Sequence, residues 1–422
     1  MSDSATIEEL TDRLFRHEAG RMVGALTRLF GTQHLELAED VVQETLLKAM
    51  RDWPYHGVPE NPAAWLHRVA KNLAIDQLRR KSRGVELLKE NAALLRSEWT
   101  LSATVAEAFS EETIADDQLR MLFACCHPSI PQEQQVALAL RTLCGFSVAE
   151  IARAFVTNEE TINKRLYRAR EAFRAIGRVE LPPTQELPLR LQPVLATIYL
   201  LFNEGYNSTD HKDLIREDLI EEALRLGDML VRHPLTAGSQ SHALLALMLF
   251  HAARSEARLD ADGAIILLAD QDRSRWDRRL ILLAERFLQE AGRGGDVSAY
   301  LLEAGIAGIH AHAPSFEETD WSTIVALYDR LLTLAPTAIV RFNRAIAVSK
   351  AQGAAAGLKA LEAVEGLAKW HLYHAARGDL LRELERKDEA LVAYDHAMDL
   401  TASPAETALL RKRAIELDLE RS

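Results

Sequence analysis

The stretch TINKRLYRAR, residues 161–170, lies in the middle of this 422-residue chain and has the pattern of an amphipathic helix. Apolar residues recur at alternating spacings of four and three and form one inward stripe: Ile162, Leu166, Ala169 and Phe173. The opposite face is polar and basic and holds Glu160, Thr161, Lys164, Tyr167 and Arg168, with Arg165 and Arg170 at its edges. A helix of this layout can enter a DNA major groove.

The preceding segment GFSVAEIA, residues 145–152, predicts a shorter helix that begins at Ser147. Ser147 and Glu150 have the spacing of a capping box, and Thr157 with Glu160 repeats that spacing before the second helix. Two helices joined by a short polar turn indicate a helix-turn-helix. The alternative is a charged face that only meets solvent. The two capping boxes and the basic, hydroxyl-bearing face favour DNA contact.

Composition predicts an all-α fold. Ala, Leu, Glu and Arg fill segment after segment at helical period, and β-branched alternation is rare. The length suggests about three domains. No apolar run reaches the roughly 18 residues that span a bilayer, and the segment 1–4 lacks a basic-then-apolar signal pattern. We therefore expect a cytoplasmic protein without a membrane segment.

The cysteines predict neither a disulfide framework nor a metal site. Cys125, Cys126 and Cys144 are too few and too poorly spaced for disulfides, and the pair beside His127 lacks the partners of a zinc site. We expect buried thiols and no metal.

An enzymatic alternative would place a metal or acid–base site at histidines in the second half of the chain. The candidates are His310 with His312, or His242 and His251. His310 and His312 diverge on a helix, and no carboxylate has the spacing that would complete a site. We therefore predict no enzyme and no cofactor.

The N-terminal third predicts a second DNA-binding face. Helices are expected over residues 10–30 and 37–53, and a third from the cap Asn61 and Pro62 to about Arg80. Polar residues line one face of the third helix at spacings of four, four and three: Arg68, Asn72, Asp76 and Arg79, with Arg80, Lys81 and Arg83 beyond. A solvated polar side is the alternative; the helix-turn-helix elsewhere in the chain favours nucleic acid.

The distribution of charge predicts a partner that helps to hold the protein on DNA. The formal net charge is −12, and most of the acidic excess follows residue 180. Non-specific affinity for duplex DNA comes from neutralising phosphates, so this chain by itself should bind weakly. The acidic, less regular stretch 86–117 suits a linker, and LPP at 181–183 marks the next boundary.

A period of about 33 residues appears toward the C-terminus and indicates stacked helix pairs. Corresponding positions are Tyr328, Leu361 and Tyr394; Leu331, Val364 and Ala397; and Leu334, Leu367 and Leu400. Gly378 and Ala390 stand where a tetratricopeptide repeat needs small residues, and Gly357 replaces the usual Ala in the middle copy. Two earlier strings, 202–206 and 271–276, have no derived role. The second is either a buried Asp–Arg network with Trp276 in the core or a partner surface.

Three motifs together resemble an extracytoplasmic-function sigma factor of bacterial RNA polymerase. They are DVVQET at 40–45, the helix from Trp65 to Arg80, and the helix-turn-helix. The resemblance covers about residues 10–180. The strings at 202–206, 271–276 and 319–321 resemble the subgroup with a long C-terminal tetratricopeptide extension.

The resemblance implies five domains and three sets of contacts. The domains are region 2 at 1–85, the linker at 86–117, region 4 at 118–180, a helical extension at 181–318 and tetratricopeptide-like repeats at 319–422. Core polymerase would contact Asp40, Gln43, Glu44 and Thr45. The melted minus-ten element would contact Arg68, Asn72, Asp76, Arg79 and Arg80, with a flipped base held by the loop 54–60. The duplex minus-thirty-five element would contact Glu160, Thr161, Lys164, Arg165, Tyr167 and Arg168.

The expected function follows from the resemblance. A sigma factor of this kind binds core RNA polymerase, directs it to promoter DNA and initiates transcription, while its acidic linker threads the channel that later carries RNA. We expect the extension to regulate the sigma core in cis and its repeats to be a candidate surface for a protein partner. The alternative is a helix-turn-helix transcriptional regulator with a repeat sensor domain, which binds duplex operator without polymerase.

Overall fold

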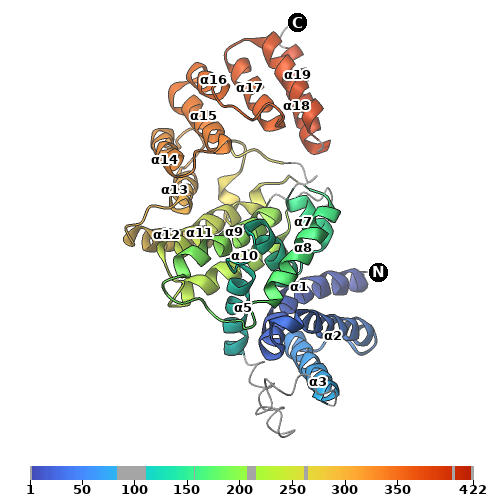
Figure 1. The fold of residues 1–422 in the computed structure, drawn as a ribbon. Helices are drawn as coiled ribbons and strands as arrows, with labels where there is room; N and C mark the ends of the chain where they lie inside the picture. The colour runs from blue at the N-terminus through green and yellow to red at the C-terminus, as the bar shows by residue number, and fades with distance from the viewer. Residues whose placement is uncertain are drawn as a thin grey trace. The chain divides into compact units, whose positions relative to one another are not determined.

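The computed structural model of the chain describes residues 2–82, 111–155, 157–206, 215–260, 265–401 and 404–419 (Figure 1). Most of these residues lie in helices, which confirms the all-α prediction. Within the described ranges, β pairing is limited to a single antiparallel bridge between Leu259 and Ile265. None of the helices described combines the length and the apolar composition needed to cross a membrane.

The chain folds into two compact units. The first comprises Met1–Thr209 and Arg216–Thr236, and the second comprises Asp210–Ile215 and Ala237–Ser422. The start of the expected helical extension therefore belongs to the same unit as the two segments predicted to bind DNA.

The first unit contains nine α-helices within its described residues. They are α1 (Ser2–Phe30), α2 (Leu35–His56), α3 (Pro62–Ser82), α5 (Glu111–Cys125), α6 (Gln132–Thr142), α7 (Val148–Ala154), α8 (Glu159–Arg174), α9 (Leu187–Tyr206) and α10 (Glu217–Arg232). A short 3₁₀ turn, η1 (Thr32–His34), joins α1 to α2.

Aromatic packing and a local cap fix the first three helices. The Phe15 and Trp53 rings lie 5.6 Å apart between centroids, and Trp53 makes an edge contact with Trp65 at 5.6 Å. Asn61 Oδ1 accepts the backbone N–H of Ala64 at 3.0 Å, so Asn61 caps α3 as predicted.

The helix-turn-helix forms as predicted, with one correction. All four residues of the stripe on α8 are buried: Ile162, Leu166, Ala169 and Phe173. Ser147 and Glu150 form the expected capping box of α7. The cap of α8, however, is Asn158 and not Thr157. The Thr157 N–H still bonds back to the Ala152 carbonyl at 2.8 Å, so the chain turns one residue later than the box spacing suggested.

The expected linker 86–117 falls mainly outside the described residues. Its last part, residues 111–117, forms the first turns of α5. Asp117 there is fully buried and accepts a hydrogen bond from Arg28 Nη1 at 2.7 Å. Asp117 thus lies on the packed side of this helix.

The second unit is a succession of helices packed against their neighbours along the chain (Figure 1). They are α11 (Ser239–Ala252), α12 (Arg278–Arg293), α13 (Ala299–His312), α14 (Trp321–Leu334), α15 (Ala338–Gln352), α16 (Ala354–Glu362), α17 (His371–Glu383), α18 (Lys387–Leu400) and α19 (Pro404–Leu419), with the 3₁₀ turns η2 (Ser255–Ala257) and η3 (Arg273–Arg275) between α11 and α12.

The 33-residue period corresponds to helix pairs. Tyr328, Leu361 and Tyr394 lie on α14, α16 and α18, the second helix of each pair. Tyr394 is fully buried, and a Cβ added to Gly378 would lie 2.6 Å from its ring. Glycine is required at position 378 because α17 and α18 pack so closely there.

The two strings without a derived role are explained by packing. In the first, the rings of Phe202 and Tyr206 stack at 5.6 Å between centroids. In the second, Arg273 Nη1 donates to the carbonyls of His310 and Ala313 at the end of α13, at 2.5 and 2.9 Å. Its guanidinium also lies 4.6 Å above the ring of buried Trp276. Arg273 therefore satisfies a helix C-terminus instead of pairing with a buried Asp.

Candidate nucleic-acid interface

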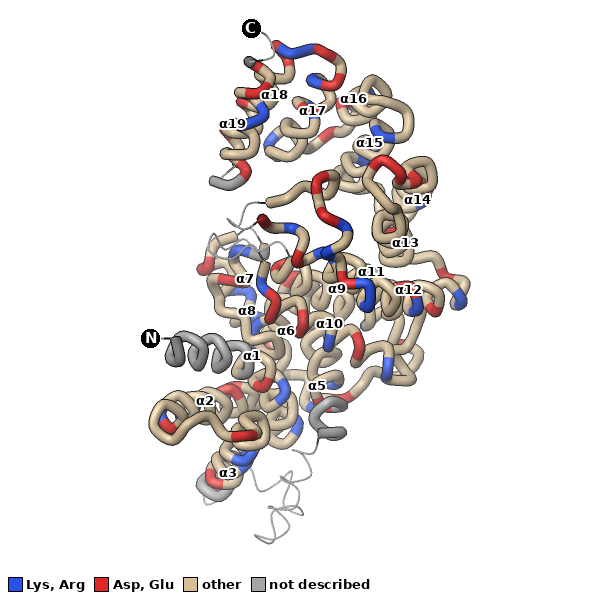
Figure 2. Tube along the Cα trace, turned by 180° about the vertical axis from the view of Figure 1, so that it is seen from behind, with Lys and Arg blue, Asp and Glu red and all other residues tan. Residues whose placement is uncertain are grey.

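The outward face of α8 presents the side chains predicted to read duplex DNA. Glu160, Lys164, Tyr167 and Arg168 are exposed, and Thr161 and Arg165 are half-buried. Charges of both signs lie along this part of the chain (Figure 2). The face is therefore accessible along the length of the helix, although it is not uniformly basic.

Two basic residues among those predicted to contact duplex DNA already have acidic partners. Lys164 Nζ donates to Glu160 Oε1 at 2.6 Å, and both side chains are exposed. Arg165 pairs with Glu133 at 2.7 Å and lies over the Phe155 ring at 5.5 Å. An exposed pair such as Lys164–Glu160 contributes about 0–1 kcal/mol, so a phosphate can replace this carboxylate at little cost.

The predicted minus-ten face lies on α3. Arg68, Asn72 and Asp76 are exposed at successive turns of the helix, opposite buried Leu66, Ala70 and Leu73. Arg79 and Arg80 fall within the last turns of α3, and their side chains lie outside the described set. The described part of the face matches the predicted arrangement.

The predicted polymerase-contact residues lie on α2, and one differs from the others. Asp40, Gln43 and Glu44 are exposed on one side of the helix. Thr45 is fully buried, and its hydroxyl donates to the Val41 carbonyl at 2.8 Å. Its side chain therefore faces the interior and not the surface formed by the other three.

The loop expected at 54–60 is shorter than predicted. α2 continues through Pro54 to His56, and Gly57, with φ of 81°, ends it. The left-handed conformation at Gly57 favours glycine, which explains why the helix stops there. Tyr55 is 86% exposed at this end of α2.

The cysteine and histidine candidates are not gathered into a metal site. All three cysteines are buried as free thiols, and burial raises the pKa of Cys126 to about 12. Among the residues described, no group of three or more His, Cys, Asp and Glu side chains could hold a metal ion. His310 makes an edge contact with Trp321, whereas His312 contacts Glu285. The two imidazoles therefore contact different residues.

The structure adds a set of contacts, which the motifs did not predict, between the two segments expected to bind DNA. Arg170 Nη2 on α8 donates to both carboxylate oxygens of Glu39 on α2, at 3.1 and 3.0 Å. Gly20 on α1 lies so near the Leu143 backbone that an added Cβ would be 1.9 Å from its carbonyl oxygen. The spacing of Gly20 and Gly24 was a sequence signal for this close packing.

Comparison with known families assigns three segments. Residues 14–84, which contain most of α1 and all of α2 and α3, match the sigma-70 region 2 family. Residues 120–173 match sigma-70 region 4, and residues 190–292 match a family of unknown function, DUF6596. The last match begins in α9 of the first unit and ends in α12 of the second.

Individual relatives fall into two groups. An uncharacterized protein of Rhizobium meliloti is 40% identical over 400 residues, which cover 94% of this chain and 93% of that protein. The ECF RNA polymerase sigma factor SigE of Mycolicibacterium smegmatis is 30% identical over 39% of this chain and 60% of its own length. The ECF RNA polymerase sigma-E factor of Escherichia coli is 29% identical over 32% of this chain and 70% of its own length. With both sigma regions present and a long extension behind them, the chain belongs to the extracytoplasmic-function sigma factors of the sigma-70 family.

Proposed function

We propose that this protein binds core RNA polymerase through the exposed face of α2 and directs it to promoters read by α3 and α8. The observation that carries the proposal is the division of α8: the four predicted inward residues are buried, and an accessible face with basic and hydroxyl groups lies opposite. This division occurs within the segment that matches sigma region 4. Sigma factors are not a class of enzymes, and the protein's proposed role is recognition.

Each DNA-binding face has a distinct task in this proposal. On α3, Asn72 and Asp76 hydrogen-bond base edges of the melted minus-ten strand, while Arg79 and Arg80 neutralise phosphate. On α8, Lys164, Arg165 and Arg168 contact phosphates of duplex minus-thirty-five DNA, and Glu160, Thr161 and Tyr167 meet the groove. Because the net charge is −12, polymerase must supply part of the affinity.

Transcription with purified core polymerase tests the proposal. The full chain should give promoter-dependent transcripts, and the pair Arg79→Ala with Arg80→Ala should lose them. Lys164→Ala with Arg168→Ala should weaken promoter recognition, while Arg279→Ala, at an exposed site on α12, serves as the control. Stable operator binding by the free protein, without transcripts, would favour the helix-turn-helix regulator instead.

We further propose that the second unit regulates the sigma core in cis. Covalent attachment raises its effective concentration beside the first unit without any additional affinity. A chain ending at Thr236 keeps all helices of the first unit. If its promoter output in cells, and the response of that output to stress, equal those of the full chain, regulation in cis is rejected.

The repeats offer a candidate protein-binding surface, which we propose is used in cells. Ile339 on α15 and Leu372 on α17 are 33 residues apart and occupy equivalent positions, and both are exposed, at 45% and 41%. Replacing both with Asp should change promoter output in cells and leave transcription with purified components unchanged. Equal output in cells from the variant and the natural chain would reject a partner at these residues.

A further inference from the structure

We propose that the first unit is a closed state of the sigma core, in which α10 fastens region 4 to region 2 and must release before both promoter elements can be read. The inference rests on the proposed promoter-recognition function and gives the extension a specific task within it. Three sets of contacts within the first unit carry the argument.

The first contact is a close approach between α1 of region 2 and the backbones of α5 and region 4. An added Cβ on Gly20 would lie 1.9 Å from the Leu143 carbonyl oxygen, and one on Gly24 would lie 3.4 Å from the Asp117 carbonyl oxygen. Arg28, one turn farther along α1, pairs with Asp117 at 2.7 Å. Two glycines four residues apart thus allow the backbones of Leu143 and Asp117 to pack directly on α1.

The second contact joins the end of α8 to the start of α2. Arg170 binds Glu39 with two hydrogen bonds. One turn farther along α8, Arg174 pairs with Glu36, which lies one turn before Glu39 on α2. The Gly177 N–H donates to buried Thr32 Oγ1 at 3.0 Å. Glu36 and Glu39 belong to the same helix as Asp40 and its neighbours, so the end of the DNA-reading helix is held beside the proposed polymerase-binding face.

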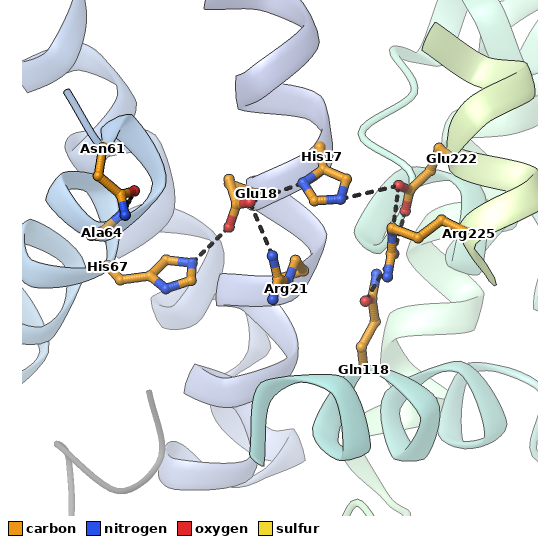
Figure 3. Close-up of polar contacts among 9 residues, drawn as sticks. All are labelled: His17, Glu18, Arg21, Asn61, Ala64, His67, Gln118, Glu222 and Arg225. Atoms are coloured by element: carbon orange, nitrogen blue, oxygen red, sulfur yellow. Dashed lines mark hydrogen bonds and ion pairs between the residues drawn. The ribbon is translucent and has the colours of Figure 1, made fainter. Parts of the chain in front are cut away.

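The third contact is a row of polar side chains that crosses from α3 through α1 to α10 and α5 (Figure 3). We call it the polar row; its members are His67, Glu18, His17, Glu222, Arg225 and Gln118. Glu18 lies 2.7 Å from His67 Nε2 and 2.9 Å from His17 Nδ1. The other nitrogen of His17 lies 3.9 Å from Glu222 on α10. Region 2 is thereby connected to the first helices of the extension.

On the far side of the polar row, α10 holds region 4. Arg225 donates to both carboxylate oxygens of Glu222, at 2.9 and 2.7 Å, and to Gln118 Oε1 on α5 at 2.9 Å. Glu18 and Glu222 are only 2% and 4% exposed. Charge-assisted hydrogen bonds in such buried positions are stronger than neutral ones, so α10 can hold regions 2 and 4 together.

The lengths of the helices show why this arrangement is incompatible with reading both promoter elements. Minus-ten and minus-thirty-five DNA lie about 25 base pairs apart, or roughly 85 Å along the duplex. In the closed unit, α3 packs on α2 and the end of α8 touches the start of α2. α2 has 22 residues, so it is about 33 Å long. The two DNA-binding faces must therefore separate.

Energy transfer between two dyes on the full chain measures the separation. Suitable sites are exposed Asp52 at the end of α2 and exposed Arg178 after α8, each replaced by Cys. The natural cysteines are buried, so the new thiols react selectively. The free protein should show high transfer efficiency. Adding core polymerase and promoter DNA should lower the efficiency, because the distance between the two dyes increases by several tens of ångströms.

Two variants test whether α10 and the glycine surface hold the closed state. Gly20→Ala places a methyl group against the Leu143 backbone, and Arg225→Ala removes the link to Gln118. Each should lower transfer efficiency in the free protein and tighten binding to core polymerase by about threefold or more, because a larger fraction is competent to bind. Arg232→Ala, on the same helix as Arg225 but in an exposed pair with Asp228, should change neither.

The outcomes separate this inference from the proposed function. If the natural chain yields no promoter-dependent transcripts, the proposed function itself fails. If it transcribes with unchanged transfer efficiency in the complex, only the closed state is overturned. The closed state would also be overturned if both variants showed the transfer efficiency and the polymerase affinity of the natural chain. Loss of helical circular dichroism in both variants would overturn it too, because the interface would then be a required part of the fold and not a releasable contact.

Discussion

Arg216 Nη1 donates to Glu150 Oε1 at 2.6 Å, and this bond ties the extension to the helix-turn-helix. The other carboxylate oxygen of Glu150 accepts the Ser147 N–H at 2.7 Å in the capping box of α7. Arg216 is the residue immediately before α10, and its backbone N–H donates to the Gly205 carbonyl of α9 at 2.7 Å. Glu150 therefore caps the start of α7 and also binds the side chain of Arg216 between α9 and α10.

Removing this bond should lower the stability of the first unit. Both side chains are mostly protected, at 15% and 12% exposure, so Arg216→Ala should lower the free energy of unfolding by about 1.5–3 kcal/mol. Thermal unfolding of the full chain measures the change. Arg293→Ala, in an exposed pair with Glu290, should cost less than about 1 kcal/mol. Equal losses in the two variants would contradict a structural role for the Arg216 bond.

The salt dependence of promoter binding should report which α8 residues meet phosphate. Arg168→Ala should weaken binding of the polymerase complex to all promoter sequences and reduce the slope of log affinity against log salt concentration by about one. Tyr167→Ala, at the neighbouring exposed position, should leave that slope unchanged. A filter-binding titration at several salt concentrations makes the comparison. An unaltered slope in Arg168→Ala would remove this residue from the phosphate contacts.

Gly378 should tolerate no side chain. An alanine Cβ would lie 2.6 Å from the Tyr394 ring, and this ring is fixed because its hydroxyl donates to Asp379 at 2.8 Å. Overpacking of this kind costs about 1–3 kcal/mol, so Gly378→Ala should lower the melting temperature of the second unit. Gly292→Ala in α12 is the matched control, since no atom lies within 4 Å of its added Cβ. A similar melting temperature for both variants would contradict the packing.

Acid should destabilise the second unit through two buried histidines. Burial and the charges of Arg254 and Arg258 lower the pKa of His251 to about 3, and burial with Arg254 and Arg273 lowers the pKa of His310 to about 4. An unfolded chain, with His pKa near 6.5, binds more protons between about pH 4 and 6.5. Stability should therefore fall as pH decreases through this window.

Thermal unfolding across that pH range checks the effect. His310→Phe keeps an aromatic ring beside Trp321 and removes one titrating group, so its stability should depend less steeply on pH. Glu303 acts in the opposite direction, because burial raises its pKa to about 7 and its ionisation costs stability as pH rises. The two histidines together should outweigh it below pH 6.5. A slope in His310→Phe equal to that of the natural chain would refute the assignment.

Local patterns were enough to predict most elements of both sigma regions. The stripe Ile162, Leu166, Ala169 and Phe173 depends on neighbours three and four residues away, and all four are buried. The capping residues Ser147 and Asn61 act within three residues of their own positions. The cap of α8 was misplaced by one residue, because two adjacent polar residues, Thr157 and Asn158, could each have served.

The sequence by itself determined the helices, their inward faces and the sigma family, because these depend on short-range periodicity and on motifs of fixed spacing. Only the tertiary structure decided which helices belong together. It joined α9 and α10 to the sigma regions and turned Thr45 into the core. The bonds from Arg170 to Glu39 and from Arg216 to Glu150 span 131 and 66 residues. No local pattern specifies such partners, since a single salt bridge leaves no periodic trace in the sequence.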